Sequence, residues 1–98
     1  MEFDAKKDAN NLVKHGVSFE DINYFEWDDS ITTPDERFEY GEHRSVSYGM
    51  MKGRLHILIW TLRNGEVRPI SFRKANKKER DFYEKKKKRT ESRQTAIH

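Results

Sequence analysis

The sequence LHILIWTLRNGEVRPISFR, residues 55–73, predicts two antiparallel strands joined by a tight turn. Residues 55–62 are apolar on both faces, which is typical of an inner strand. Asn64-Gly65 follows, and this dipeptide favours a two-residue hairpin turn because both residues readily adopt a positive φ. Residues 67–73 form the expected last strand. Pro69 has no N–H group to donate, so we expect one edge of this strand to be free there.

Strand and helix patterns around this hairpin predict an α+β fold. Residues 44–50 alternate between apolar and small or polar side chains, which is the period of a strand. Lys52-Gly53 is expected to form a hairpin turn after this strand. Helices are expected over residues 5–15, 19–27 and 77–88, where apolar residues follow helical spacing or capping residues precede the helix. Asn76 and Glu79 have the spacing of a capping box at the start of the last helix. The predicted order is two N-terminal helices, an antiparallel sheet of three to four strands and a C-terminal helix.

Length and composition are those of a small domain without disulfides. The 98 residues suffice for one domain, expected over residues 1–89 with a flexible tail over residues 90–98. There is no cysteine, which fits a reducing cytosol. The N-terminal residues lack the apolar stretch of a signal peptide, and the longest apolar run is too short to span a bilayer. We therefore expect a cytoplasmic protein that does not contact a membrane.

The net charge of +3 conceals two halves of opposite sign. Residues 1–49 contain 12 acidic and 5 basic residues, whereas residues 50–98 contain 5 acidic and 15 basic residues. Such a split suggests a polyanion as the partner of the basic half. The alternative is that the two halves attract each other within the fold.

Basic and polar side chains are concentrated on the predicted last strand and at the start of the last helix. Strand alternation points Ile70 and Phe72 into the core, and Pro69, Ser71 and Arg73 to the open face. Arginines on an open sheet face can form a forked phosphate site, and the helix N-terminus adds N–H groups to it. A solvated basic face with an ordinary capped helix is the alternative.

RNA cleavage at such a site needs neither a metal nor a cofactor. A base removes the proton of the 2′-hydroxyl, fixed cations stabilise the charge on phosphorus, and an acid protonates the leaving 5′-oxygen. No motif for zinc or for a phosphate-binding loop is present. The candidates for the base are His15, His56, Glu79 or a lysine or tyrosine. His15 at a helix end and His56 within the central strand also have structural alternatives.

Three blocks of sequence together resemble the BrnT toxin family. They are E-F-D-x-x-K…N-x-x-K-H-G-V-S-F-E-D, D-E-R-x-x-Y-G-E-x-R and T-x-R-x-G-x-V-R-x-I-S-x-R-K-A-x-x-x-E-R-x-x-Y, in order between Glu2 and Tyr83. The resemblance implies a RelE-like fold and a ribonuclease that arrests translation. It also implies a BrnA-type antitoxin with a ribbon-helix-helix region, forming a hetero-oligomer that contacts operator DNA only through the antitoxin.

The resemblance, taken with the basic cluster, gives two sets of candidate residues. The expected catalytic residues are Arg63, Arg73, Lys14, His15 and Glu79. The expected RNA-binding residues are Arg68, Ser71, Lys74, Lys77, Arg80 and Tyr83. The chain departs from the family pattern at Pro69 and Phe72, where we expect an aliphatic and a small residue.

The acidic half offers a docking surface for a basic antitoxin segment. Its expected members are Asp28, Asp29, Asp35 and Glu36. The alternative to a toxin is a non-catalytic nucleic-acid-binding module, or a corepressor that acts with a DNA-binding partner. Such a module would bind nucleic acid with a steep salt dependence and would not cleave it.

Overall fold

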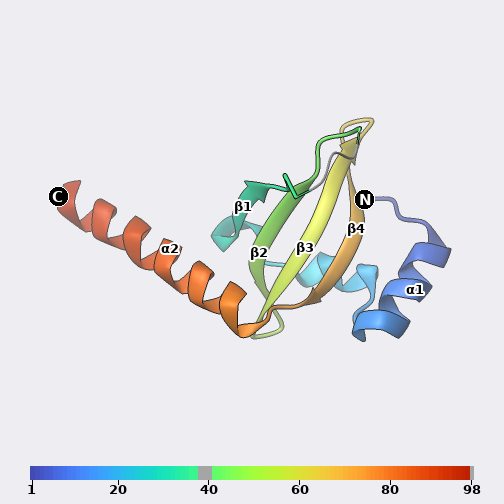
Figure 1. Cartoon of the computed structure of the whole chain (residues 1–98), viewed down its shortest axis with the longest axis horizontal. Coiled ribbons are helices and arrows are strands. Elements are labelled where there is room, and N and C mark those ends of the chain that lie inside the picture. Colours follow the sequence, from blue (N-terminus) through green and yellow to red (C-terminus); the bar gives the residue numbers. More distant parts are fainter. Residues whose placement is uncertain (38–40, 98) are drawn as a thin grey trace.

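Four antiparallel strands form one sheet in the order β1-β2-β3-β4, with the N-terminal helix beside β4 (Figure 1). The computed structural model describes residues 1–37 and 41–97, and only the backbone of residues 91–97. The elements are α1 (Ala5–His15), the 3₁₀ helices η1 (Phe19–Tyr24) and η2 (Trp27–Asp29), β1 (Ile31–Pro34), β2 (Ser45–Met51), β3 (Arg54–Arg63), β4 (Glu66–Lys74) and α2 (Lys77–Ile97). The predicted α+β class and the antiparallel sheet are confirmed.

Tight turns join the last three strands, as the sequence predicts. Asn64 and Gly65 have φ of 54° and 77°, which is the conformation that an Asn-Gly hairpin requires. Lys52 and Gly53 repeat it between β2 and β3. β3 has a neighbour on both sides, in agreement with its predicted inner position.

The N-terminal part holds one α-helix and two 3₁₀ helices, so the prediction of a second helix over residues 19–27 is wrong. α1 has the expected bounds and is capped by Asp4, whose carboxylate accepts from the N–H group of Lys6 at 2.7 Å. After η1, Phe25 turns extended and forms a bridge with Met51 of β2. This pairing with the sheet ends the helical turn. The expected RelE-like architecture stays a prediction.

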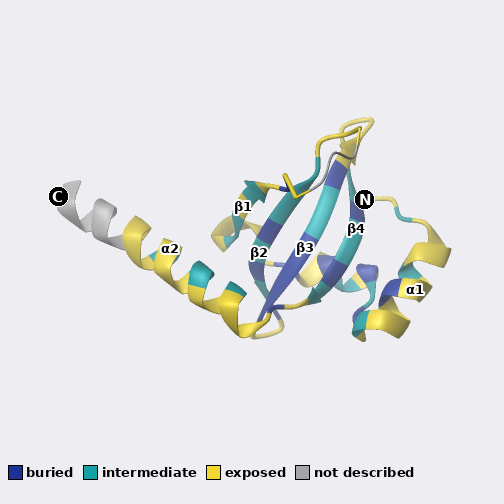
Figure 2. Cartoon of the chain, in the orientation of Figure 1, coloured by how far each residue is buried: buried dark blue, intermediate teal, exposed yellow. Residues whose placement is uncertain are grey.

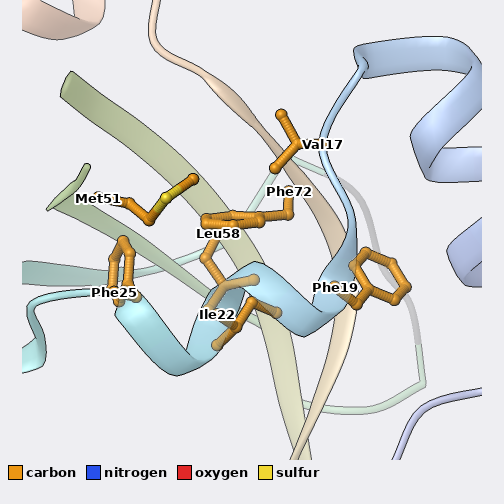
Figure 3. Close-up of a cluster of buried hydrophobic side chains, with 7 residues drawn as sticks. All are labelled: Val17, Phe19, Ile22, Phe25, Met51, Leu58 and Phe72. Atoms are coloured by element: carbon orange, nitrogen blue, oxygen red, sulfur yellow. The ribbon is translucent and has the colours of Figure 1, made fainter. Parts of the chain in front are cut away.

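One face of the sheet is packed against η1 and carries the main core (Figure 3). Aromatic rings meet edge to face here, with Phe25 and Phe72 centroids 5.9 Å apart. Gly49 is required because an added Cβ would lie 2.5 Å from the Phe25 ring. The buried members of the core are Val17, Phe19, Ile22, Phe25, Met51, Leu58 and Phe72.

α1 packs against the sheet through a polar residue. The side chain of Asn11 is buried and donates to Phe72 O and Val17 O at 2.8 Å, while its Oδ1 accepts from Phe72 N at 3.1 Å. The apolar residues Leu12 and Val13 are exposed instead, Val13 to 89%. The outer edge of β4 has no neighbouring strand, so its backbone groups lack a strand partner there. The side chain of Asn11 supplies this partner for Phe72.

A bulge between Ile59 and Trp60 corrects the predicted alternation along β4. Trp60 pairs with Pro69 and Ile59 pairs with Ser71, so Ile70 is the extra residue. Pro69 is buried and lies on the core face opposite Trp60, although we expected it on the open face. An extra residue reverses the side-chain alternation on one side of a bulge, which explains the error.

α2 crosses one end of the other sheet face and then extends away from the body (Figure 1). The Phe82 ring lies 4.9 Å from that of Tyr48, and Tyr83 Oη donates to Asp29 O at 3.0 Å. Beyond this contact the described side chains are largely exposed (Figure 2). The helix continues to Ile97, past the predicted end at Lys88, because no Gly or Pro interrupts it. The domain boundary at residue 89 stays a prediction.

Among the described residues, no helix has an apolar stretch long enough to cross a bilayer.

Candidate functional site

Arg73 and Glu79 form a two-pronged ion pair where β4 leads into α2. Arg73 Nη1 donates to Glu79 Oε1 and Nη2 donates to Oε2, each at 2.8 Å. Glu79 Oε1 also accepts from Asn76 N, and Asn76 Oδ1 accepts from Glu79 N, both at 2.9 Å. The predicted capping box is confirmed, and it fixes the carboxylate that holds Arg73. The side chains are 27% and 19% exposed, so the pair is partly shielded from solvent.

The titration of the pair follows from these contacts. Burial acts to raise the pKa of Glu79, but hydrogen bonds from Arg73 and from Asn76 N–H outweigh it, so the pKa lies below its usual value. The hydrogen bond to Glu79 raises the pKa of Arg73. Glu79 is therefore a carboxylate at neutral pH, and its oxygens are occupied by donors.

Tyr48 lies on the same sheet face as Arg73. Tyr48 pairs with Ile57 and Ile57 pairs with Arg73, so the three side chains form one row across β2, β3 and β4. Two strand spacings separate Tyr48 from Arg73, about 10 Å between backbones. Burial raises the pKa of Tyr48 and the charge of Glu79 adds to this, while Arg73 and Arg37 act to lower it. The phenol therefore lies within the electrostatic field of the ion pair.

Arg37 and Asp35 form a second two-pronged pair beside this row. Arg37 Nε and Nη2 donate to the two carboxylate oxygens of Asp35 at 2.9 and 3.1 Å. The Asp35 side chain is 1% exposed, whereas that of Arg37 is 59% exposed. The charge of Arg37 also acts on the titration of Arg73 and Glu79. Sequence reasoning missed Arg37 and Tyr48 as site residues, although Tyr48 lies in the alternating stretch of residues 44–50.

The C-terminal end of α1 approaches Arg73 from outside the sheet. Lys14, His15 and Ser71 line one shallow pocket between α1 and β4. Partial burial lowers the pKa of His15, and the charges of Lys14 and Arg73 lower it further. His15 is therefore neutral at neutral pH and able to accept a proton. The structure thus brings together five of the predicted site residues, the Arg73 cluster: Lys14, His15, Ser71, Arg73 and Glu79.

Arg63, the last residue of β3, and Arg68 of β4 lie at the hairpin end of the sheet, away from Arg73. They line a second pocket near the hairpin turn together with Glu66. Five residues of strand separate Arg68 from Arg73, which is roughly 15 Å. Arg63 is 55% exposed and lies 3.8 Å from the carboxylate of Glu42. The basic group expected as one site is therefore divided into two.

The remaining RNA-binding candidates surround the start of α2. Lys74, Lys77 and Arg80 are exposed, and Arg80 Nη1 donates to Ala75 O at 3.2 Å. Tyr83 bonds to the backbone of Asp29, so its hydroxyl helps to hold α2 against η2. These three basic side chains border the Arg73 cluster without joining its hydrogen bonds.

His56 lies on the core face and supports the structural alternative for this residue. Its Nδ1 is 2.8 Å from Arg54 O and its ring is 5.3 Å from that of Phe72. Burial lowers the pKa of His56. The sheet separates it from the row of Tyr48 and Arg73.

The acidic candidates for antitoxin binding differ in exposure. Asp28, Asp29 and Glu36 are exposed, and Asp29 lies 3.8 Å from Lys87 of α2. Asp35 is buried and holds Arg37, so it offers its charge to a neighbour within the chain.

Comparison with known proteins agrees with the resemblance seen in the sequence. The family described as the ribonuclease toxin BrnT of type II toxin-antitoxin systems matches residues 3–79. A comparison with curated proteins gave no significant match. A toxin of this type implies an antitoxin partner and an RNA substrate. The family match covers most of the chain, including α1, the whole sheet and the start of α2, and the chain therefore belongs to the BrnT family of ribonuclease toxins.

Proposed function

We propose that the protein is a metal-independent endoribonuclease whose centre is the Arg73 cluster. The observation that carries this proposal is the two-pronged pair of Arg73 and Glu79 beside a neutral histidine. Arg73 binds the scissile phosphate and stabilises the charge that develops on it. Glu79 orients Arg73, and Lys14 adds a second positive charge.

The reaction uses the nucleophile that RNA itself supplies. His15 accepts the proton of the 2′-hydroxyl, and the 2′-oxygen attacks the adjacent phosphorus. The guanidinium of Arg73 replaces the charge stabilisation that a metal ion gives in other nucleases. Ser71 lines the same pocket and offers a hydroxyl to the phosphate.

The second basic pocket extends the contact with RNA. Arg63 and Arg68 bind phosphates farther along the strand, and Lys74, Lys77, Arg80 and Tyr83 border the centre. Cleavage arrests translation in the cytoplasm. A BrnA-type ribbon-helix-helix antitoxin neutralises the toxin and docks on the exposed acidic side chains of Asp28, Asp29 and Glu36, whereas Asp35 is buried against Arg37 and is left out of this surface.

Incubation of purified protein with defined RNA, followed by mapping of both new ends, tests this function. We expect internal cleavage with a 5′-hydroxyl end, undiminished by a chelator, and its loss in Arg73→Ala. Binding with a steep salt dependence but no cleavage would favour the non-catalytic alternative instead.

A further inference from the structure

The geometry points to Tyr48 as the general acid of this site, the group that protonates the leaving 5′-oxygen. The inference rests on the proposed ribonuclease function and adds a residue to its centre. Three observations carry it: the position of Tyr48 relative to Arg73 and His15, the support of its ring, and the charges around its hydroxyl.

Tyr48 and His15 lie on opposite sides of Arg73. α1 packs on the outer edge of β4 through Asn11, whereas Tyr48 is two strands inward on β2 (Figure 1). A displacement at phosphorus places the attacking and leaving oxygens roughly in line on opposite sides. A phosphate on Arg73 would therefore present one of these oxygens toward His15 and the other toward Tyr48.

The Tyr48 ring is held in place from two directions. It stands on an inner strand, between β1 and β3, and packs against the Phe82 ring at 4.9 Å. A rigid strand positions a functional group more closely than a loop does. The side chain of Tyr48 is only partly buried, so part of it can be reached from the open face.

The surroundings of the hydroxyl suit proton donation. Burial keeps the pKa of Tyr48 above its usual value, so the phenol carries its proton at neutral pH. The guanidinium groups of Arg73 and Arg37 act in the opposite direction and stabilise the phenolate that forms when the proton leaves. The buried carboxylate of Asp35 holds Arg37 in place through two hydrogen bonds and so fixes the position of this charge.

The step balances without a further reactant. The proton of the 2′-hydroxyl passes to His15 and the 2′-oxygen–phosphorus bond forms. The bond between phosphorus and the 5′-oxygen breaks, and that oxygen takes the proton of Tyr48. The products are a 2′,3′-cyclic phosphate and a 5′-hydroxyl, and solvent returns the proton to the phenolate and removes that of the imidazolium.

A pair of substrates tests the role of Tyr48 in Tyr48→Phe, which keeps the ring on Phe82. One RNA has the normal 5′-oxygen, and the other has sulfur in its place. A thiol is a far stronger acid than an alcohol, so a thiolate leaves without an acid. We expect the variant to cleave the oxygen substrate roughly 100-fold or more slowly than the wild type. Both proteins should cleave the sulfur substrate at similar rates.

Two control variants separate this role from others. Tyr24→Phe removes an exposed phenol on η1 and should behave as the wild type. Arg73→Ala should remain slow on both substrates, because sulfur does not replace the cation.

The remaining outcomes count against the inference. Tyr48→Phe that cleaves the oxygen substrate at the wild-type rate would overturn it and leave the ribonuclease function intact. A variant equally slow on both substrates would give Tyr48 a positioning role rather than that of the acid. A wild-type protein that cleaves neither RNA would overturn both proposals.

Discussion

The hairpin between β3 and β4 and the opposite end of β4 both carry arginines, but the fold holds these arginines differently. At the hairpin end, Arg63 is largely exposed and meets Glu42 only at 3.8 Å. At the other end, Arg73 is partly buried, pairs with Glu79 through two bonds of 2.8 Å, and its charge acts on the titration of His15 and Tyr48. An exposed ion pair contributes little and leaves its side chain mobile, whereas a shielded and doubly bonded one fixes a geometry. Arg63 can therefore attract RNA, whereas Arg73 is held firmly enough to act on a single phosphate.

Removal of Arg73 should have the largest effect. Arg73→Ala should lower kcat/KM for RNA cleavage at least 100-fold, which corresponds to about 3 kcal/mol of transition-state stabilisation. Arg68→Ala, on the same strand at the other end, is the matched variant and should lose less than about fivefold. Cleavage rates on one RNA oligonucleotide measure both, and equal losses would remove the distinction between the two ends.

The connection between α1 and β4 should matter for stability. Asn11→Ala leaves the N–H and C=O groups of Phe72 without their side-chain partner, so the free energy of unfolding should fall by about 2–3 kcal/mol. Asn10→Ala on the exposed side of the same helix should change it by less than about 0.5 kcal/mol. Urea denaturation followed by circular dichroism compares the two. Similar values would show that the edge of β4 does not depend on Asn11.

Glu79→Gln distinguishes an orienting carboxylate from a base. Glutamine can still cap the helix at Asn76 and accept one bond from Arg73, so we expect only about a tenfold loss of kcat/KM. Loss of a general base would cost about 10²- to 10⁴-fold. Glu84→Gln, an exposed position on α2, serves as the control. A loss of 1,000-fold would make Glu79 the base and remove that role from His15.

The pH dependence of cleavage should report the environment of His15. A base acts in its neutral form, and burial together with Lys14 and Arg73 lowers the pKa of this imidazole below 6.5. The rate should therefore stay high as the pH falls through 6.5 and decline only below it. Lys14→Gln removes one of the positive charges, so the decline should move to higher pH. An unchanged or lower midpoint in the pH profile of kcat/KM would contradict this assignment.

The sequence predicts the turns and helix caps of this fold better than the contacts between its elements. Asn64-Gly65 and the capping box of Asn76 and Glu79 are short-range signals, and both are found as expected. The second helix was wrong because its end depends on the pairing of Phe25 with Met51, a contact that no local pattern specifies. The orientation of Pro69 was wrong for the same reason, since the bulge arises from the pairing of two strands.

The sequence predicts several residues of the candidate site but not their arrangement in space. Lys14, His15, Ser71, Arg73 and Glu79 come together as a group. The prediction groups Arg63 and Arg68 with them by residue type, although five residues of extended strand between Arg68 and Arg73 already imply a separation of roughly 15 Å. Tyr48 and Arg37 belong to segments whose approach to Arg73 depends on strand order, so composition and spacing gave no sign of it.

The smallest effect should follow from Arg63→Ala. Its guanidinium is exposed and its contact with Glu42 is long, so the protein should fold with unchanged stability and lose less than about twofold in cleavage at moderate salt. A cation that only attracts RNA acts through screened, long-range forces, so the loss should grow at low salt and vanish at high salt. Cleavage measured across a salt series in Arg63→Ala and the wild type tests this. A large loss that persists at high salt would place Arg63 at the reacting phosphate, and the hairpin end and the Arg73 end of the sheet would then act as one site.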